Sequence, residues 1–322
     1  MTTSEKQHLD LIIPCYNEAE GLPELFARLD ALRTALDLHL ELYFIDDGST
    51  DETLELVKSY QPQAKSGFET SAHYLSFSRN FGKEAALLAG LRASRSELVA
   101  LIDADLQDPP ELLIEMLPML ETSDLDTVIA VRSDRKGEAW FVSLASRLFY
   151  ALMKKLSKTE IISGVRDYRL MKRPVVDAIL SLAEYNRFSK GLFSWVGFKK
   201  AYLPYDNQVR KSGKSKWNLT SKIKYAIDGF VNFSEAPLEI ATFSGLSLVS
   251  ITILAIIFLV VRQLFWHHSV NGWTSMIVIM LFCFGFVLLM LGIIGKYISN
   301  IFLETKRRPV YIIREEDEKN AK

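Results

Sequence analysis

Short apolar runs alternate with amphipathic stretches from Leu9 to Val131. The runs end at polar or turn-forming residues, as buried strands do, and apolar residues recur at helical spacing between them. The predicted strands are Leu9–Ile13, Leu40–Ile45, Tyr74–Phe77, Leu98–Ile102 and Thr127–Val131. The predicted helices are Leu22–Leu36, Thr53–Tyr60, Glu84–Ala93 and Glu111–Leu120. Short connections between them favour an α/β fold with a doubly wound, mostly parallel sheet.

Local signals set the expected ends of these elements. Pro14 is expected to end the first strand, and Ser49 with Glu52 forms a capping-box pattern before the second helix. Farther on, the stripe from Trp140 to Leu156 predicts a helix that packs on the core, with lipid contact as the alternative. Residues 164–173 predict a charged turn against a short strand, closed by Pro174.

Two long apolar runs follow, Ile240–Val261 and Trp273–Gly295, and neither contains a charged residue. Each is long enough to cross a hydrocarbon core of about 30 Å as a helix. Lysines and arginines lie mainly outside the pair, so both flanks are expected in the cytosol. The expected parts are a domain over 1–205, a basic interfacial segment over 206–239, a hairpin of two transmembrane helices over 240–298 (about 240–261 and 273–295) and a tail over 299–322. The tail is expected to be disordered from Glu315 on.

Composition narrows the class of protein. The 322 residues carry 38 Lys and Arg against 39 Asp and Glu, a balance that does not favour general nucleic-acid binding. The segment before Leu9 has no apolar core and does not predict a secretory signal. Cys15 and Cys283 are the only cysteines, one beside a strand and one within an apolar run, which argues against a structural disulfide.

Acidic residues follow the fourth predicted strand directly. Asp103 and Asp105 are one residue apart, a spacing that suits a divalent cation which also binds nucleotide phosphates. A turn or helix cap is the alternative for such a loop. Polar residues also follow the other early strands, and four loops at one sheet edge predict a nucleotide cleft. These residues are Asn17, Glu18, Asp46, Asp47, Arg79 and Asn80, with Lys83 as a further cation for the diphosphate.

The segment from Asp206 to Lys224 is strongly basic, with six Lys or Arg residues against one Asp and a net charge of +5. Its sequence RKSGKSKW at 210–217 combines cations, hydroxyls and a glycine, which suits a phosphate. Attraction to anionic lipid, worth about 1 kcal/mol per cation, is the alternative.

Taken together, these motifs resemble the family-2 glycosyltransferases that load a sugar onto a polyprenyl phosphate. The similar groups are the GtrB-type bactoprenol glucosyltransferases and the relatives of dolichol-phosphate mannose synthase, over about Leu9 to Arg308. The motifs are PCYNE at 14–18, DDGSTD at 46–51, SRNFGKEAA at 78–86, DADLQDPPE at 103–111, GVRDYRLMKR at 164–173 and RKSGKSKW at 210–217. The resemblance implies a GT-A fold, a UDP- or GDP-sugar donor, Mg²⁺ or Mn²⁺ and inversion at the anomeric carbon.

The resemblance also implies roles for single residues. The base and ribose would contact Pro14, Tyr16, Glu18 and Asp46, and the nucleotide would also contact Asp103. Asp105, with Gln107, would bind the metal, and the acceptor phosphate would contact Arg210, Ser215 and Lys216. Asp167 matches the acid often proposed as a base. A phosphate monoester has its second pKa near 6, however, so the acceptor is already largely anionic and needs little deprotonation. We therefore expect Asp167 to orient cations or the sugar.

The expected activity is transfer of one sugar, with UDP-glucose as the leading donor, to undecaprenyl phosphate. The expected place is the cytosolic face of a bacterial inner membrane, with both termini cytosolic, and the product would serve cell-envelope glycan modification. The processive synthases carry a Gln-x-x-Arg-Trp segment that this sequence lacks. A homotetramer is expected from relatives. The alternatives are transfer to another lipid such as diacylglycerol and a non-catalytic, transferase-like flippase component.

Overall fold

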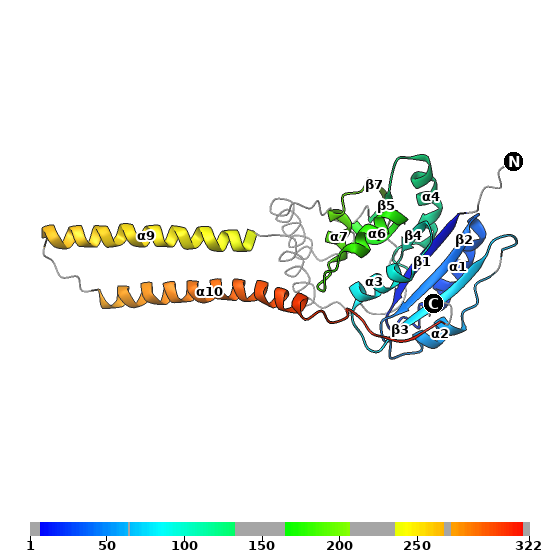
Figure 1. The fold of residues 1–322 in the computed structure, drawn as a ribbon, viewed down its shortest axis with the longest axis horizontal. Coiled ribbons are helices and arrows are strands. Elements are labelled where there is room, and N and C mark those ends of the chain that lie inside the picture. The colour runs from blue at the N-terminus through cyan, green and yellow to red at the C-terminus, as the bar shows by residue number, and fades with distance from the viewer. Residues whose placement is uncertain (1–6, 64, 133–164, 207–235, 267–271, 318–322) are drawn as a thin grey trace.

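The computed structural model describes residues 7–63, 65–132, 165–206, 236–266 and 272–317. They form an α/β domain and two long helices that project from it (Figure 1). The expected helix over Trp140–Leu156 and the expected acceptor-phosphate residues Arg210, Ser215 and Lys216 lie outside the described residues.

The domain is built on one sheet, which has eight strands in the described part of the chain, in the order β7-β5-β6-β4-β1-β2-β3-β8. β1 pairs in parallel with β2 and β4, and β2 with β3, whereas β6 and β8 run antiparallel to their neighbours. The predicted mostly parallel sheet is therefore confirmed, with two antiparallel strands added. The strands are β1 His8–Cys15, β2 His39–Asp46, β3 Thr70–Phe77, β4 Leu98–Leu101, β5 Thr127–Arg132, β6 Val165–Lys172, β7 Lys200–Tyr205 and β8 Ile313–Glu316.

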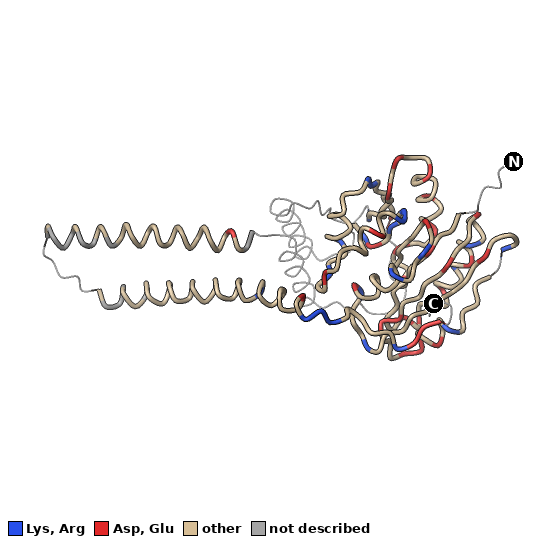
Figure 2. Tube along the Cα trace, in the orientation of Figure 1, with Lys and Arg blue, Asp and Glu red and all other residues tan. Residues whose placement is uncertain are grey.

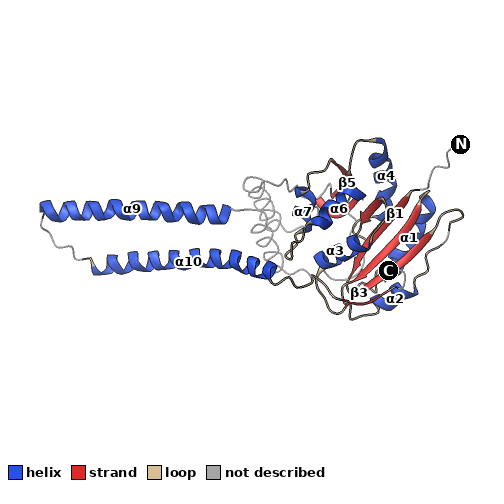
Figure 3. Ribbon diagram, viewed as in Figure 1, coloured by secondary structure: helices blue, strands red, loops and turns tan. Residues whose placement is uncertain are grey.

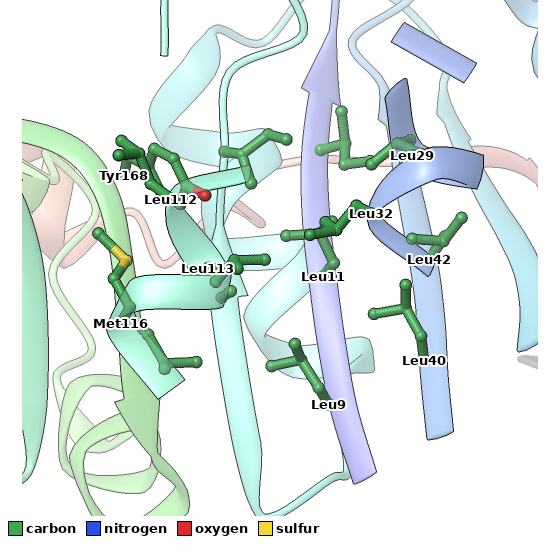
Figure 4. Packing of buried hydrophobic residues seen from close by; sticks show 14 of the residues in the cluster. Leu9, Leu11, Leu29, Leu32, Leu40, Leu42, Leu112, Leu113, Met116 and Tyr168 are labelled. Atoms are coloured by element: carbon green, nitrogen blue, oxygen red, sulfur yellow. The ribbon is translucent and has the colours of Figure 1, made fainter. Parts of the chain in front are cut away.

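Helices cover both faces of this sheet (Figure 3). Alternate residues of β1 point to opposite faces, so Leu11 and Ile13 pack with α1 and α4, and Ile12 packs with α3 and α6. Figure 4 shows the first of these two apolar clusters. The helices of the domain are α1 Leu22–Ala35, α2 Thr53–Ser59, α3 Lys83–Ala93, α4 Leu113–Thr122 after a 3₁₀ turn at Pro110–Leu112, α6 Arg173–Ser181 and α7 Ser189–Trp195.

Helix α3 lies unusually close to β1. A Cβ atom at Gly90 would come within 2.2 Å of Ile12 Cγ2, so a side chain at this position would push the helix off the sheet. Lys83 is the first residue of α3, so the close packing of Gly90 on Ile12 also helps to set the position of Lys83 relative to the sheet.

Two predicted ends are wrong. Pro14 lies inside β1, opposite Ile45, rather than after it. The carbonyl of Ile12 accepts the N–H of Ile102, so Ile12 faces β4, and the backbone nitrogen of Pro14, two residues on, faces the same way. The pairing of β1 with β4 ends at Ile12, so a missing N–H at Pro14 costs no sheet hydrogen bond. The capping box at Ser49 does not form, because α2 has no side-chain cap bond from its N-cap residue and its first N–H donates to Asp51 instead.

The short strand predicted within 164–173 is present, but the charged turn predicted beside it is wrong. Residues 165–172 all belong to β6, an eight-residue strand between β4 and β5 in the sheet. Pro174 does not simply close the strand, because it lies in the first turn of α6, where the missing N–H costs no helical bond.

The two projecting helices are α9 Ala236–Trp266 and α10 Trp273–Thr305. Their apolar side chains face outward, with Phe243 and Leu281 each 66% exposed, and Figure 2 shows almost no charge along them. Both contain stretches long and apolar enough to cross a membrane, Leu238–Ala255 and Ile279–Thr305. The predicted pair of membrane-spanning helices therefore has the length and composition that this role requires.

The chain returns to the domain after α10. Residues 313–316 form β8, which pairs with β3 and is the outermost strand on this side of the sheet, so the prediction of disorder from Glu315 on is wrong for Glu315 and Glu316. The sequence of β8 contains few apolar residues and so gave no strand pattern. An edge strand of this kind is stabilised by backbone hydrogen bonds to its neighbour and by nearby cations. Here Lys58 forms an ion pair with Glu315 at 2.8 Å.

Candidate active site

Side chains from several elements meet at the edge of the sheet where β1, β2 and β4 end. The antiparallel β6 begins at this edge, since Arg169 pairs with Leu101 at the end of β4 and Asp167 lies beyond that pair. Asp167 is thereby placed beside residues that lie far away in the sequence. This strand direction brings Asp103 and Asp167 together at one site.

Lys83 connects these two carboxylates. Its Nζ atom lies 2.7 Å from Asp103 Oδ1 and 2.5 Å from Asp167 Oδ2. Burial by itself would raise the pKa of Asp167, but Lys83 and then Lys190 outweigh burial and hold that pKa below its usual range. Burial would likewise lower the pKa of Lys83, and the two carboxylates hold it above its ordinary value. Lys83 and Asp167 are therefore both charged at neutral pH.

The loop after Asp103 turns sharply. Leu106 has φ of +57° and is 8% exposed, so its buried side chain holds a backbone conformation that is rare outside glycine. Asp105 Oδ1 accepts the N–H of Gln107 at 3.2 Å. This turn leaves the carboxylates of Asp103 and Asp105 half-buried at the edge of the sheet.

Arg166 holds the end of that loop. Its guanidinium donates to Gln107 Oε1 at 2.8 Å and to Asp108 Oδ1 at 3.0 Å. Tyr205, at the end of β7, donates its hydroxyl to the same oxygen of Asp108. Asp108 is fully buried, and its Oδ2 has no hydrogen-bond partner within the described ranges. The sequence analysis assigned no role to Arg166 or Tyr205. Arg166 lies within the motif at 164–173, next to Asp167, whereas Tyr205 lies outside the motifs and is brought here by the pairing of β7 with β5.

The donor atoms at this edge suit a hard divalent cation. Carboxylate oxygens are the ligands that Mg²⁺ and Mn²⁺ prefer, and Mg²⁺ is commonly bound by one or two carboxylates together with substrate phosphates. Among the residues that the structure describes, no three His, Cys, Asp or Glu side chains gather into a ready cation site. The set therefore fits a metal whose remaining ligands come from a bound phosphate, with Asp103 and Asp105 as the available carboxylates.

The acids that end β2 have different surroundings. Asp46 is 1% exposed and accepts bonds from Ser49 N–H at 3.1 Å and from the Ser76 hydroxyl at 2.7 Å. Asp47 accepts the N–H groups of Phe81 at 2.6 Å and of Gly82 at 2.9 Å. Burial raises the pKa of Asp47 to about 6, against the opposing effect of these two N–H groups. Both carboxylates hold neighbouring loops.

Gly48 explains why these two loops lie so close together. Its φ is +66°, and a Cβ atom there would approach the carbonyl carbon of Arg79 to 2.4 Å. Arg79 in turn places its guanidinium 3.9 Å from the centre of the Phe81 ring. The backbone of Arg79 therefore rests directly on the loop after β2.

The loop after β1 joins the same assembly. Asn17 Oδ1 accepts the N–H of Thr50 at 2.7 Å, and the N–H of Glu18 donates to the Thr53 hydroxyl at 2.8 Å. Tyr16 and Glu18 are half-buried beside it, and Pro14 is the last residue but one of β1. The predicted donor-site residues from the first three loops are thus brought to one edge of the sheet.

Comparison with known proteins agrees with the sequence motifs. The profile of glycosyl transferase family 2 matches residues 10–180. CsbB of Bacillus subtilis, which carries a provisional glycosyltransferase name, is 41% identical over 307 residues, covering 95% of this chain and 91% of that protein. The bactoprenol glucosyl transferase of Shigella phage SfV is 36% identical over 311 residues, covering 97% of this chain and 99% of that protein.

A solved structure of glucosyl-3-phosphoglycerate synthase from Mycobacterium tuberculosis, in complex with Mn²⁺ and UDP-glucose, is a more distant match. It has a TM-score of 0.43 and 20% identity, and the match covers 70% of this chain and 77% of that one.

Proposed function

The chain belongs to glycosyl transferase family 2, and from this membership we propose that it transfers one glucose from UDP-glucose to undecaprenyl phosphate with inversion at the anomeric carbon. The observation that carries the proposal is the similarity to bactoprenol glucosyl transferases along nearly the whole chain, the hairpin helices included. The arrangement of charges at the sheet edge supports it, because a nucleotide diphosphate needs both cations and a metal-binding carboxylate.

In this proposal the donor lies along the ends of β1, β2 and β4. Pro14, Tyr16 and Glu18 contact the base and ribose, Asp103 contacts the nucleotide, and Arg79 adds positive charge near the diphosphate. Asp46 and Asp47 contribute chiefly by fixing the loops around the donor, which their burial and their bonds to backbone N–H groups support.

Asp105 is the proposed metal ligand, with Gln107 as its partner. When bound, Mg²⁺ or Mn²⁺ would supply charge stabilisation for the leaving diphosphate. The oxygen of Gln107 accepts from Arg166 in the structure, so binding a metal there requires Gln107 to leave this bond or to use its second lone pair. Asp103 has a half-buried carboxylate and is available to the same cation.

Asp167 is proposed to orient charge rather than to remove a proton. Its carboxylate is already paired with Lys83, and an acceptor phosphate is largely ionised at neutral pH. A general base would give a different result. If Asp167→Asn abolished turnover without changing either substrate affinity, and high pH restored it, Asp167 would be the base.

The acceptor is proposed to reach the site from the membrane. Arg210, Ser215 and Lys216 are the proposed ligands of its phosphate. Helices α9 and α10 project from the α/β domain toward the same side (Figure 1), which supports a cytosolic domain with both chain ends on the domain's side of the membrane. A homotetramer is retained as a proposal from the resemblance.

The direct test is to give purified full-length protein a panel of nucleotide sugars with Mg²⁺ or Mn²⁺, and to present undecaprenyl phosphate and diacylglycerol separately. We expect a glycolipid product from UDP-glucose and undecaprenyl phosphate only. Product on diacylglycerol alone would replace the proposed acceptor. The absence of transfer and donor hydrolysis with every sugar would favour the non-catalytic flippase component.

A further inference from the structure

The chain beyond α10 contacts the α/β domain along β3, at the residues that follow β3, and at Arg92 of α3, which donates to the Tyr311 hydroxyl at 3.5 Å. We name residues 309–317, which include β8, the C-terminal strap. Figure 1 shows this segment in red, running from the end of α10 to the outer edge of β3. None of the sequence motifs described above lies within it. It directly connects a membrane-spanning helix to the edge of the catalytic sheet.

One end of the strap is fixed along β3. Glu315 forms an ion pair with Lys58 at 2.8 Å, and the N–H of Asp317 donates to Tyr74 O at 3.1 Å. The buried ring of His73 lies between Asp317, at 3.1 Å from Nδ1, and Glu41, at 2.7 Å from Nε2. These polar contacts hold the strap to β3.

The other end of the strap contacts the start of the Lys83 loop, residues 78–82. Tyr311 stacks on Phe77, with ring centres 5.0 Å apart and planes 14° apart. The carbonyl oxygen of Ile312 accepts the N–H of Ser78 at 2.9 Å. Phe77 also contacts Phe81 edge to face at 5.8 Å. Tyr311 and Ile312 thus contact the residues at which the chain leaves β3.

The Lys83 loop ends in the site. Its last two N–H groups, those of Phe81 and Gly82, donate to Asp47, and the next residue is Lys83, which pairs with Asp103 and Asp167. The loop is therefore held at its end by Asp47 and at its start by the strap. Loss of the strap contacts would release the start of the loop, while Asp47 and the packing of Gly48 against Arg79 would still hold its later part.

We propose that Tyr311 is a positioning residue for the transfer reaction. Its stacking on Phe77, next to the Ile312–Ser78 bond, fixes the Lys83 loop so that Lys83 stays between Asp103 and Asp167. The membrane-spanning hairpin and the donor site are then parts of one continuous framework. The inference rests on the proposed function for its kinetic consequence only, since the effect on the loop is measurable without any substrate.

The structural test is hydrogen exchange on the full-length protein in lipid nanodiscs, comparing the wild type with Tyr311→Ala. An aromatic pair of this kind gives a stabilisation equivalent to about a tenfold change in an opening equilibrium. We expect backbone exchange in residues 78–82 to become about tenfold faster, while exchange in β1 stays unchanged. Tyr311→Phe keeps the ring and is expected to restore wild-type exchange.

The kinetic test uses the same variants with UDP-glucose and undecaprenyl phosphate. Tyr311→Ala is expected to lower kcat by about tenfold, with little change in the KM for the lipid, and Tyr311→Phe to behave as wild type. Arg314→Ala is the matched control, because Arg314 lies on β8 and pairs only with Glu315 at the surface among the contacts described. Arg314→Ala is expected to leave both readouts unchanged.

Unchanged exchange in residues 78–82 of a folded Tyr311→Ala protein would overturn the proposal. So would an equal effect of Arg314→Ala, because it would indicate general loosening of the tail. If Tyr311→Ala does not fold, Tyr311→Leu takes its place, because it keeps an apolar group but lacks the flat ring. Faster exchange in residues 78–82 of Tyr311→Leu would support the proposal, and unchanged exchange would overturn it. If the wild type transfers no sugar, the proposed function fails, and the exchange data still decide the role of Tyr311.

Discussion

Two pairs of aspartates lie at the same edge of the sheet, and their surroundings differ. Asp46 and Asp47, at the end of β2, are 1% and 4% exposed and accept bonds from neighbouring N–H and hydroxyl groups. Asp103 and Asp105, after β4, are half-buried, and Asp103 pairs with the cation of Lys83. The first pair joins loops, and the second presents carboxylate oxygens to a ligand.

The two pairs differ in a way that the sequence does not show. In the sequence both pairs follow an apolar run and precede a turn, so both predict a ligand site. A buried carboxylate that accepts backbone N–H groups stabilises the loops it joins, whereas a carboxylate paired with a lysine can exchange that partner for another cation. Substitutions at the two strand ends should therefore affect different properties.

The largest effect is expected at Asp105. Asp105→Asn keeps an oxygen that can accept the Gln107 N–H, so the fold should remain, but it removes the charge that a divalent cation needs. Metal stabilisation of a leaving group is worth several kcal/mol, and we expect transfer to fall by about 100-fold or more. Steady-state transfer and the thermal midpoint measure the two properties separately.

The control for Asp105→Asn is Asp124→Asn, a change to an acid whose side chain is 91% exposed and which pairs with Lys199 at the surface. This control should leave transfer unchanged. Normal metal-dependent transfer by Asp105→Asn would refute the assignment of Asp105 as the metal ligand.

A smaller loss of activity, with a change in pH dependence, is expected for Lys83→Met. In this variant Asp167 stays buried but loses its nearest cation. Burial raises the pKa of a carboxyl group, so the pKa of Asp167 should rise from its depressed value. In the wild type Asp167 stays ionised even at pH values below the ordinary aspartate pKa of about 3.9. The stability that its ion pair contributes is therefore present at neutral pH and is lost only when the pH falls through the depressed pKa of the folded state. In the variant, protonation begins at higher pH.

We expect Lys83→Met to lower transfer by about tenfold at neutral pH, since a hydrogen bond between charged groups is worth about 1.5–3 kcal/mol. The loss should grow toward pH 5 relative to the wild type. Rate profiles from pH 5 to 9 measure both effects, with the exposed Lys199→Met as control. Parallel profiles for the variant and the wild type would show that Lys83 does not set the ionisation of Asp167.

At Asp47 the main expected change is in stability. Asp47→Ala leaves the N–H groups of Phe81 and Gly82 without their acceptor, at a cost of about 1–3 kcal/mol. Thermal unfolding in detergent should show a lower midpoint, and transfer should fall less than in Asp105→Asn. Asp37→Ala, a change to an acid with an 81% exposed side chain, is the control. An unchanged midpoint for Asp47→Ala would remove the distinction between the two strand ends.

Much of this architecture could be read from the sequence. Apolar runs at strand spacing and helical periodicity predicted the strands and helices from Leu9 to Val131, because burial on both faces of a parallel sheet imposes that pattern. The two charge-free runs predicted α9 and α10 for a similar reason, since a hydrocarbon core excludes charge over about 30 Å. Both are local patterns that a single segment carries.

Other features depend on partners far away in the chain. Residues 165–172 carry too many charges to resemble a central strand, yet they form β6 between β4 and β5. Glu315 and Glu316 resemble a disordered tail, yet they pair with β3. Backbone hydrogen bonding to a strand distant in sequence decides both cases, and it leaves no local apolar pattern.

The sequence by itself thus determined which segments are buried, which are long and apolar enough to cross a membrane and which acids follow the strands, since these follow from the local pattern of polarity. Only the tertiary structure decided that Asp47 holds the Lys83 loop and that Asp103 meets Lys83 and Asp167. The physical reason is that the environment of a carboxylate, and therefore its charge and its availability to a ligand, is set by the groups that folding brings around it.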